Sequence, residues 1–169
     1  GEGIINQEAV TAWALSGPVA RAAGVPIDIR SDEPALRYAQ LTAHRVVLGE
    51  DGDVRSRLVQ LAREVDIAAA CVAEAATMCQ SLGTSPVNVL LPKVLRVPVG
   101  EYDRRIETPL GIAHWLLAST GDKMPQRLAL RPASLHTVLA LETALVGAHV
   151  SRIAAIVASM PFLTGDAER

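Results

Sequence analysis

The chain has 169 residues, of which 50% are apolar and only 3% aromatic, and its formal net charge is −2. This length suits one domain that buries roughly two-thirds of its unfolded surface, and a charged fraction of 20% excludes an extended disordered chain. With so few aromatic residues, Ala, Val, Leu and Ile must build the core, which favours closely packed helices over an aromatic-rich β-sandwich. No basic stripe with interleaved aromatics occurs, so we expect no nucleic-acid partner.

Local patterns predict the following elements in chain order: helices over 6–15 and 19–23, an extended segment over 26–30, a loop over 31–50 with a brief helix near 34–41, a long helix over 53–83, a connector over 86–98, strands over 103–107, 112–118 and 126–130, and helices over 131–149 and 150–160. The turns between the three strand-like segments suggest an antiparallel meander. The expected class is α+β and mostly helical, with a long central helix, a small antiparallel β-meander and a C-terminal helix pair in a single domain over 1–169.

The long helix has the clearest pattern. Asp53 would cap its start and Gly83 would end it, which gives a length of about 45 Å. Apolar residues recur along it at three- and four-residue steps, at Val54, Leu58, Leu61, Val65, Ala68/Ala69, Val72, Ala75/Ala76 and Cys79. Glu64 and most other charged residues are assigned to other faces. A helix this long either spans the whole molecule or projects its apolar stripe toward a partner.

The two cysteines, Cys71 and Cys79, fall in this helix, about 12 Å apart along its axis. A disulfide needs Cα atoms within about 7 Å, so both are expected to be buried thiols that pack as small hydrophobes. The longest nearly uninterrupted apolar segment, 153–163, is about half the length that spans a bilayer. A soluble, reduced, cytoplasmic setting is therefore expected.

Few residues by themselves indicate chemistry. The four histidines show no metal-ligand spacing, and no nucleotide-binding or nucleophile motif occurs. Asp28 and Arg30 would point to one side of an extended segment, either as a structural ion pair or as a polar contact at a subunit interface. Glu107, which precedes a Pro-x-Gly turn, is either a turn anchor or a functional carboxylate.

Several short segments together resemble a known family. They are Gly3–Ala9, Leu15–Val25, Asp28–Arg30, Tyr38–Leu41, Gly52–Arg57, Glu107–Gly111, Arg131–Leu135 and Gly165–Arg169. In this order they resemble the C-terminal part of the D subunit of NADH-quinone oxidoreductase (respiratory complex I), within the wider family of nickel-iron hydrogenase large subunits. The resemblance extends over nearly the whole chain.

This resemblance implies a component of an electron-transfer complex that packs against an iron–sulfur subunit near the quinone site. The chain would carry no cofactor or metal of its own, and quinone and iron–sulfur clusters would belong to the assembled complex. Other complex subunits would be partners, and membrane association, at the cytoplasmic face of the inner membrane, would occur only through them. The positions carried over from the motifs as interface or framework residues are Arg21, Asp28, Arg30, Glu107 and Arg131.

The chain departs from the family pattern where that pattern has charged residues. Leu110 and Ile112 replace a basic and an acidic residue around the turn glycine, Ala39 and Arg152 replace aspartates, and the last Cys-x-x-Cys of the hydrogenases is missing. No complete active site is therefore expected in this chain. The alternative is a non-catalytic scaffold or assembly protein that retains the hydrogenase-like fold. On either view we expect an exposed apolar face, through which the isolated chain would form a homodimer.

Overall fold

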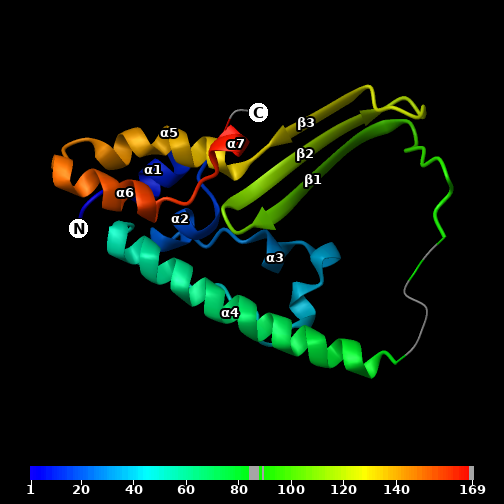
Figure 1. Cartoon of the computed structure of the whole chain (residues 1–169), viewed down its shortest axis with the longest axis horizontal. Helices are drawn as coiled ribbons and strands as arrows, with labels where there is room; N and C mark the ends of the chain where they lie inside the picture. The colour runs from blue at the N-terminus through cyan, green and yellow to red at the C-terminus, as the bar shows by residue number, and fades with distance from the viewer. Residues whose placement is uncertain (84–87, 89, 168–169) are drawn as a thin grey trace.

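The computed structural model describes residues 1–83, 88 and 90–167 and has the expected α+β class (Figure 1). The helices are α1 Gln7–Ala12, α2 Gly17–Ala22, α3 Ile29–Asp32, α4 Val54–Ser81, α5 Ala133–Leu145, α6 Ile153–Ser159 and α7 Thr164–Ala167, with 3₁₀ turns at Pro34–Leu36, Tyr38–Gln40 and Val150–Arg152. The strands are β1 Gly100–Thr108, β2 Gly111–Ser119 and β3 Arg127–Arg131. Helices α1, α2, α5 and α6 gather at one end, and the sheet extends away from them.

Two of the N-terminal elements are shorter than expected, whereas α2 begins two residues earlier than predicted, at Gly17. Asn6 does cap α1, because its Oδ1 accepts from Ala9 N at 2.9 Å, but the helix ends at Ala12 since Ala14 adopts a left-handed φ of 50°. The extended segment expected over 26–30 ends at Asp28, which starts α3 instead. The Asp28 carboxylate accepts from Arg30 N at 3.0 Å, so it acts as a helix cap.

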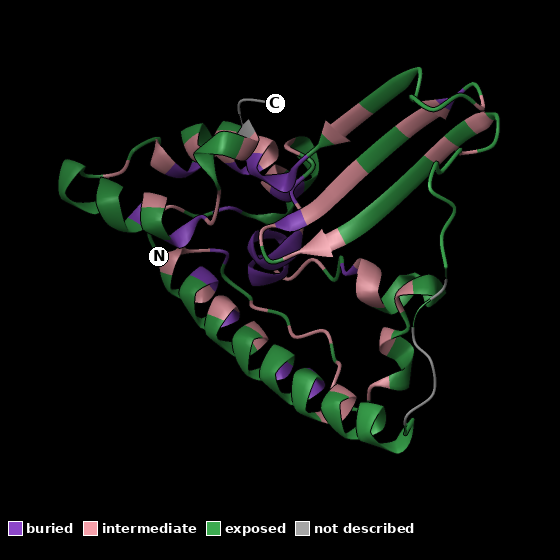
Figure 2. Ribbon diagram, turned by 45° about the vertical axis from the view of Figure 1, so that its right-hand side comes forward, coloured by how far each residue is buried: buried purple, intermediate pink, exposed green. Residues whose placement is uncertain are grey.

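The long helix α4 begins and ends as the sequence predicts. Asp53 Oδ1 accepts from Ser56 N at 2.7 Å, and Gly83 takes a left-handed φ of 64° just after the helix. The residues of α4 that are buried against the rest of the chain are Arg57, Gln60, Ile67 and Cys71. The apolar stripe faces outward, with Val65 66% and Val72 69% exposed (Figure 2). Cys79 is exposed as well, so the expectation of two buried thiols is wrong for this residue.

The meander has the expected antiparallel order β1–β2–β3. In its first hairpin Glu107 pairs with Ile112, and Arg105 pairs with His114. The next pairing places Arg131 opposite His114. Residues that are paired across an antiparallel sheet share one of its faces. Part of the predicted connector over 86–98 lies outside the described residues.

The core is built by aliphatic side chains of the helical end. Its buried members are Ile5, Val10, Leu15, Val19, Ala20, Ala23, Ala140, Ala144, Ile156 and Met160. Helix α5 ends at Leu145 rather than near His149, because Gly147 turns the chain with a φ of 76°. The last predicted helix is split into a 3₁₀ turn and α6. Within the described residues no helix is both long and apolar enough to span a bilayer.

Candidate functional site

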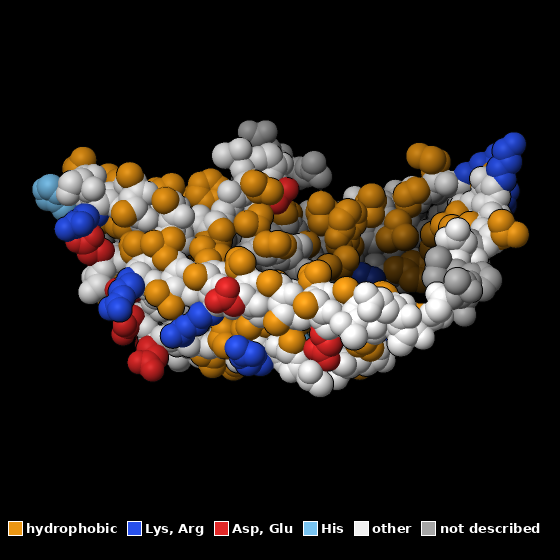
Figure 3. Space-filling model, turned by 60° about the horizontal axis from the view of Figure 1, so that its bottom comes forward, with side chains coloured by type: hydrophobic (Ala, Val, Ile, Leu, Met, Phe, Trp, Pro, Cys, Tyr) orange, Lys and Arg blue, Asp and Glu red, His pale blue; other side chains and the backbone are white. Residues whose placement is uncertain are grey.

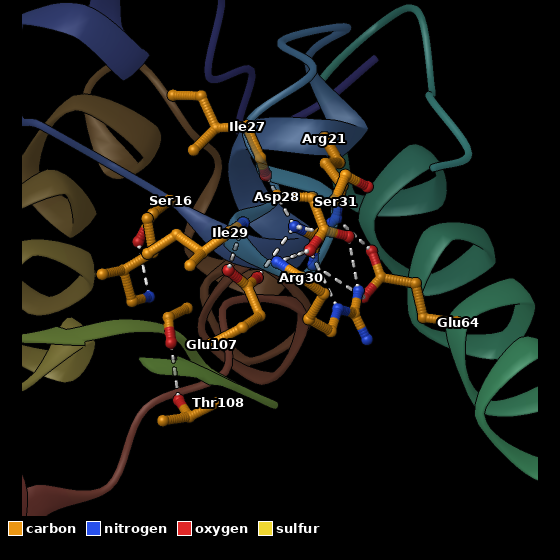
Figure 4. A network of polar contacts seen from close by, with 12 residues as sticks. Ser16, Arg21, Ile27, Asp28, Ile29, Arg30, Ser31, Glu64, Glu107 and Thr108 are labelled. Atoms are coloured by element: carbon orange, nitrogen blue, oxygen red, sulfur yellow. Dashed lines mark hydrogen bonds and ion pairs between the residues drawn. The ribbon is translucent and has the colours of Figure 1, made fainter. Parts of the chain in front are cut away.

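The centre of the candidate site is Arg21, which lies on the short, fully buried helix α2 (Figure 4). Its side chain is 1% exposed, although it carries a charge. The helix starts with Gly17 and Pro18, and Pro18 supplies the fixed φ that suits a first helical turn. Small and aliphatic neighbours allow α2 to lie between α4 and the sheet, so Arg21 reaches side chains from both.

The β1–β2 turn contacts the start of α2 directly. Ser16 Oγ accepts from Ile112 N at 2.9 Å, and a Cβ on Gly17 would collide with the backbone of Gly111. Gly17 also has a left-handed φ of 68°, which a side chain would strain. These contacts bring Glu107, near the end of β1, to the side of α2 that carries Arg21.

Arg21 binds two carboxylates from different elements. Its Nε and Nη2 donate to the two oxygens of Glu64, at 2.7 and 2.8 Å. Its Nη1 donates to Glu107 Oε1 at 2.8 Å and to the Ile27 carbonyl at 2.7 Å. The guanidinium thus joins α4, β1 and the loop before α3 through short, charge-assisted hydrogen bonds.

Asp28 and Arg30 extend the same network. Arg30 Nε and Nη2 donate to the two Asp28 oxygens at 2.9 and 2.7 Å, and Asp28 Oδ2 lies 3.7 Å from Arg21 Nη1. Arg30 Nη2 is also 4.0 Å from Glu64 Oε2. The structural ion pair considered for Asp28 and Arg30 therefore forms, with Asp28 at a helix cap.

Four of the five positions carried over from the family resemblance meet in this network, namely Arg21, Asp28, Arg30 and Glu107. The fifth, Arg131, lies apart, exposed at the end of β3. We name Arg21, Asp28, Arg30, Glu64 and Glu107 the arginine–carboxylate network. Whether these positions act as framework or interface residues remains a prediction.

The sequence reasoning missed Glu64 and Gln60. Gln60 Nε2 donates to Glu64 Oε1 and to the Val47 carbonyl, both at 2.8 Å. The charge of Glu64 favours an outer face of the helix, yet the side chain turns toward Arg21. A signal was nevertheless present, because Arg57, Gln60 and Glu64 follow the three- and four-residue steps of one helical face.

Burial and charge act in opposite directions on the network. Burial lowers the pKa of Arg21, but the hydrogen bonds and charges of Glu64 and Glu107 outweigh it, so the pKa lies above its ordinary value. Burial likewise raises the pKa of Asp28, yet Arg30 holds that pKa below its ordinary value. For Glu107 burial dominates and raises the pKa, despite the hydrogen bond from Arg21. Glu107 therefore keeps its proton to a higher pH than Asp28 does, because the two pKa values are shifted in opposite directions.

The arginine–carboxylate network is closed rather than a binding pocket. The space bounded by Arg21, Asp28, Arg30 and Glu64 has no room for a water-sized sphere. These carboxylates are engaged by guanidinium groups, and within the part of the chain described here no group of three or more His, Cys, Asp or Glu could hold a metal ion. The arrangement can fix α2, α3, α4 and β1 to one another.

Comparison with known proteins gives consistent matches over the whole chain. The profile of the family described as "Respiratory-chain NADH dehydrogenase, 49 Kd subunit" matches residues 1–93 and 77–169. One NADH-quinone oxidoreductase D subunit of Streptomyces coelicolor is 42% identical over 174 residues, which cover 100% of this chain and 44% of the relative. The D subunit of Bacillus cytotoxicus is 32% identical and is covered to 45%. The chain thus spans less than half the length of these relatives.

A solved structure supports the same assignment. An archaeal respiratory membrane complex, the membrane-bound sulfane sulfur reductase, contains a chain that superposes with a TM-score of 0.87 at 28% identity. The superposition covers 100% of this chain and 46% of the other. The sequence profile, the curated relatives and the shared fold all agree. This chain belongs to the family of the 49 kDa subunit of the respiratory NADH dehydrogenase, which is the D subunit of NADH-quinone oxidoreductase.

Proposed function

We propose that the chain serves as a structural component of an NADH-quinone oxidoreductase-type electron-transfer complex and packs against an iron–sulfur subunit near the quinone site. The observation that carries the proposal is the match of the entire chain to relatives that are D subunits, of which it spans 44% in Streptomyces coelicolor. In this role the chain shapes the route of electrons to quinone and needs no redox cofactor of its own. Its attachment to the membrane is indirect, through other subunits at the cytoplasmic face.

The outer face of α4 supports a role in assembly. Eight residues with a seven-residue repeat line it, and we name them the α4 seam: Leu58, Leu61, Val65, Ala68, Val72, Ala75, Cys79 and Leu82. Four of them are large or β-branched and strongly exposed, with Leu58 at 49%, Val65 at 66%, Val72 at 69% and Leu82 at 66%. Apolar residues in this repeat are typical of helices that pack along another helix.

The seam itself is continuous and carries no charged residue. Figure 3 looks onto the side of the molecule formed by α4, and hydrophobic side chains run along it, with charged groups interspersed and most frequent toward one end. A monomer rarely exposes an apolar stripe of this length to water. We infer that a helix of another polypeptide segment of the complex covers the α4 seam.

The experiment is a comparison of tagged proteins purified gently from the native host. Co-purifying subunits are identified by mass spectrometry, and iron is measured in the same eluate. The wild-type chain should bring iron–sulfur and membrane subunits with it. Val65→Glu and Val72→Glu should lose them, whereas Ala70→Glu, on an exposed flank of the same helix outside the seam, should retain them.

A second candidate function, a non-catalytic scaffold or assembly protein, has its own support. Leu110 and Ile112 stand where the family motif has charged residues, and the arginine–carboxylate network is closed to ligands. A clean, iron-free homo-oligomer from the native host would favour this candidate and refute the electron-transfer role.

A further inference from the structure

A second feature, separate from the arginine–carboxylate network, is a cavity between one face of the sheet and the N-terminal helices. Its volume is about 540 Å³, within the range of roughly 300–1,000 Å³ that is typical of small-molecule sites. Arg105, His114 and Arg131 line it from the sheet, and α1 with the loops at 14–16 and 25–27 lines it from the other side. No charged side chain of the arginine–carboxylate network lines it, although Arg21 donates a hydrogen bond to the backbone carbonyl of Ile27.

The sheet side of the cavity is cationic because of the strand register. Arg105 on β1 is paired with His114 on β2, and His114 is paired with Arg131 on β3. The three side chains therefore form a row on one face of the sheet. The two arginines are two strands apart, roughly 10 Å at the backbone, a separation that two long side chains can close onto one anion.

The positive charge in this row is only partly neutralised. Asp103 Oδ1 lies 2.7 Å from His114 Nε2 and is 60% exposed. Among residues 1–83, 88 and 90–167, no carboxylate lies within 4.0 Å of the guanidinium of Arg105 or Arg131, in contrast to Arg21 and Arg30. The two arginines repel each other across the row, so a bound anion would stabilise this arrangement.

The opposite wall of the cavity is largely apolar. Leu15, Val25 and Ile27 line it, and they provide a surface for a hydrocarbon group, while Ile112 adds an apolar side chain beside His114 on the sheet side. His136 adds a polar edge. Its Nδ1 lies 3.0 Å from the Trp13 carbonyl, and because a carbonyl only accepts, Nδ1 carries the proton and Nε2 is left as an acceptor in the neutral ring.

We propose that this cavity binds a small amphiphilic anion, with its charged group between Arg105 and Arg131 and its apolar chain against Leu15, Val25 and Ile27. The ligand class is a carboxylate or phosphate monoester on an aliphatic chain. The two charges select the head group, and the apolar wall selects the chain. This proposal is independent of the role in assembly, because neither the α4 seam nor the arginine–carboxylate network takes part.

The test is calorimetric titration of the purified chain with decanoate, hexanoate and the uncharged decanol. Decanoate should bind at one site, with affinity rising by up to about fourfold for each methylene that becomes buried. Decanol should bind at least about tenfold more weakly, because it lacks the charge that the arginines hold. Dodecyl phosphate should compete with decanoate for the same site.

Variants locate the binding site. Arg105→Gln and Arg131→Gln should each weaken decanoate binding by about five- to tenfold. Arg127→Gln is the matched control, since it removes a charge from the same face of β3 outside the cavity and should change affinity by less than about twofold. Methyl NMR signals of Val25 and Ile27 should shift on binding.

Three results would overturn the proposal. One is the absence of decanoate binding, and another is equally tight binding of decanol. The third is unchanged decanoate affinity in both Arg105→Gln and Arg131→Gln, which would place any binding elsewhere on the surface. Because both arginines are exposed, neither substitution should unfold the chain.

Discussion

Replacement of Arg21 by methionine is the most informative perturbation of the fold. Methionine fills a similar volume but removes all four hydrogen bonds that the guanidinium donates to Glu64, Glu107 and Ile27. Glu107, whose side chain is 3% exposed, is then left with the Ile29 amide at 3.4 Å. Among the described residues, Glu64 then keeps the side-chain amide of Gln60 and the more distant Arg30 guanidinium as polar partners.

The expected loss of stability in Arg21→Met depends on the buried carboxylates that lose their partner. Removal of one partner from a buried ion pair costs about 3–5 kcal/mol, because the other charge remains buried and uncompensated. Three ion pairs are lost here, with Glu64, Glu107 and the more distant Asp28, but they share one guanidinium, so their costs do not add. Protonation of Glu107, whose pKa is already raised by burial, relieves part of the cost. We therefore expect a loss of about 4 kcal/mol at neutral pH, which is a large fraction of a typical total of about 5–15 kcal/mol.

The assay is urea unfolding followed by tryptophan fluorescence and circular dichroism between pH 4 and pH 7. The loss in Arg21→Met should shrink as pH falls, since Glu107 takes up a proton and no longer needs the guanidinium. Arg104→Met, at an exposed position on β1, should stay within about 0.5 kcal/mol of the wild type. If Arg21→Met does not fold, the double variant Arg21→Met/Glu107→Met should recover folding. A loss below about 1 kcal/mol at neutral pH would refute the reasoning.

The remaining predictions concern the same region. Glu107→Gln should change the free energy of unfolding by less than about 1 kcal/mol at neutral pH, because burial raises the Glu107 pKa and the fold already disfavours the ionised carboxylate. The cost of burying that carboxylate is absent below the pKa of the unfolded chain and appears as pH rises through the pKa of the folded chain. Asp28→Asn should cost about 2–3 kcal/mol at neutral pH, because the folded chain lowers the Asp28 pKa. The stabilisation by the ionised Asp28 is present above the pKa of the unfolded chain and is lost as pH falls through the pKa of the folded chain. Equal stability of Asp28→Asn and Glu107→Gln in urea unfolding from about pH 3 to 7 would contradict this. Gly17→Ala should cost at least about 3 kcal/mol by the same urea assay, because it strains a left-handed backbone and drives a Cβ into Gly111, whereas Gly147→Ala, with a similar φ but open space, should cost only about 1 kcal/mol.

The boundaries of α4 could be predicted because local side-chain chemistry determines them. Asp53 caps α4 through its own carboxylate, and Gly83 supplies the left-handed residue that ends it. The meander was visible in alternating strands and Gly-containing turns. The short helix α3 was missed because a sequence of four residues carries no period, and only the Asp28 cap distinguishes it from an extended segment.

Most residues of the candidate site could be named from the sequence, but their contacts with one another could not. The resemblance marked Arg21, Asp28, Arg30 and Glu107 as important positions, yet nothing in their spacing shows that all four meet. That meeting depends on the close contact of Gly17 with the β1–β2 turn and on the position of α4, both of which are tertiary. Glu64 was missed for the same reason, since a charged residue on a helix is usually solvated.

In helix α4 the hydrophobic pattern predicts the helix correctly but does not predict which of its faces is buried within the chain. Two stripes with the same three- and four-residue spacing run along it, one apolar and one with Arg57, Gln60, Glu64, Ile67 and Cys71. Hydrophobicity alone favours the apolar stripe as the buried one, but the chain buries the second against its own α2 and α6. The polar groups of that stripe are tolerated because Arg57 finds Ser159 and two carbonyls, and Glu64 finds Arg21. Helix α4 thus buries the stripe from Arg57 to Cys71 within the chain and leaves its apolar stripe exposed as a second packing surface. This is the physical reason to expect the α4 seam to be covered in the assembled complex.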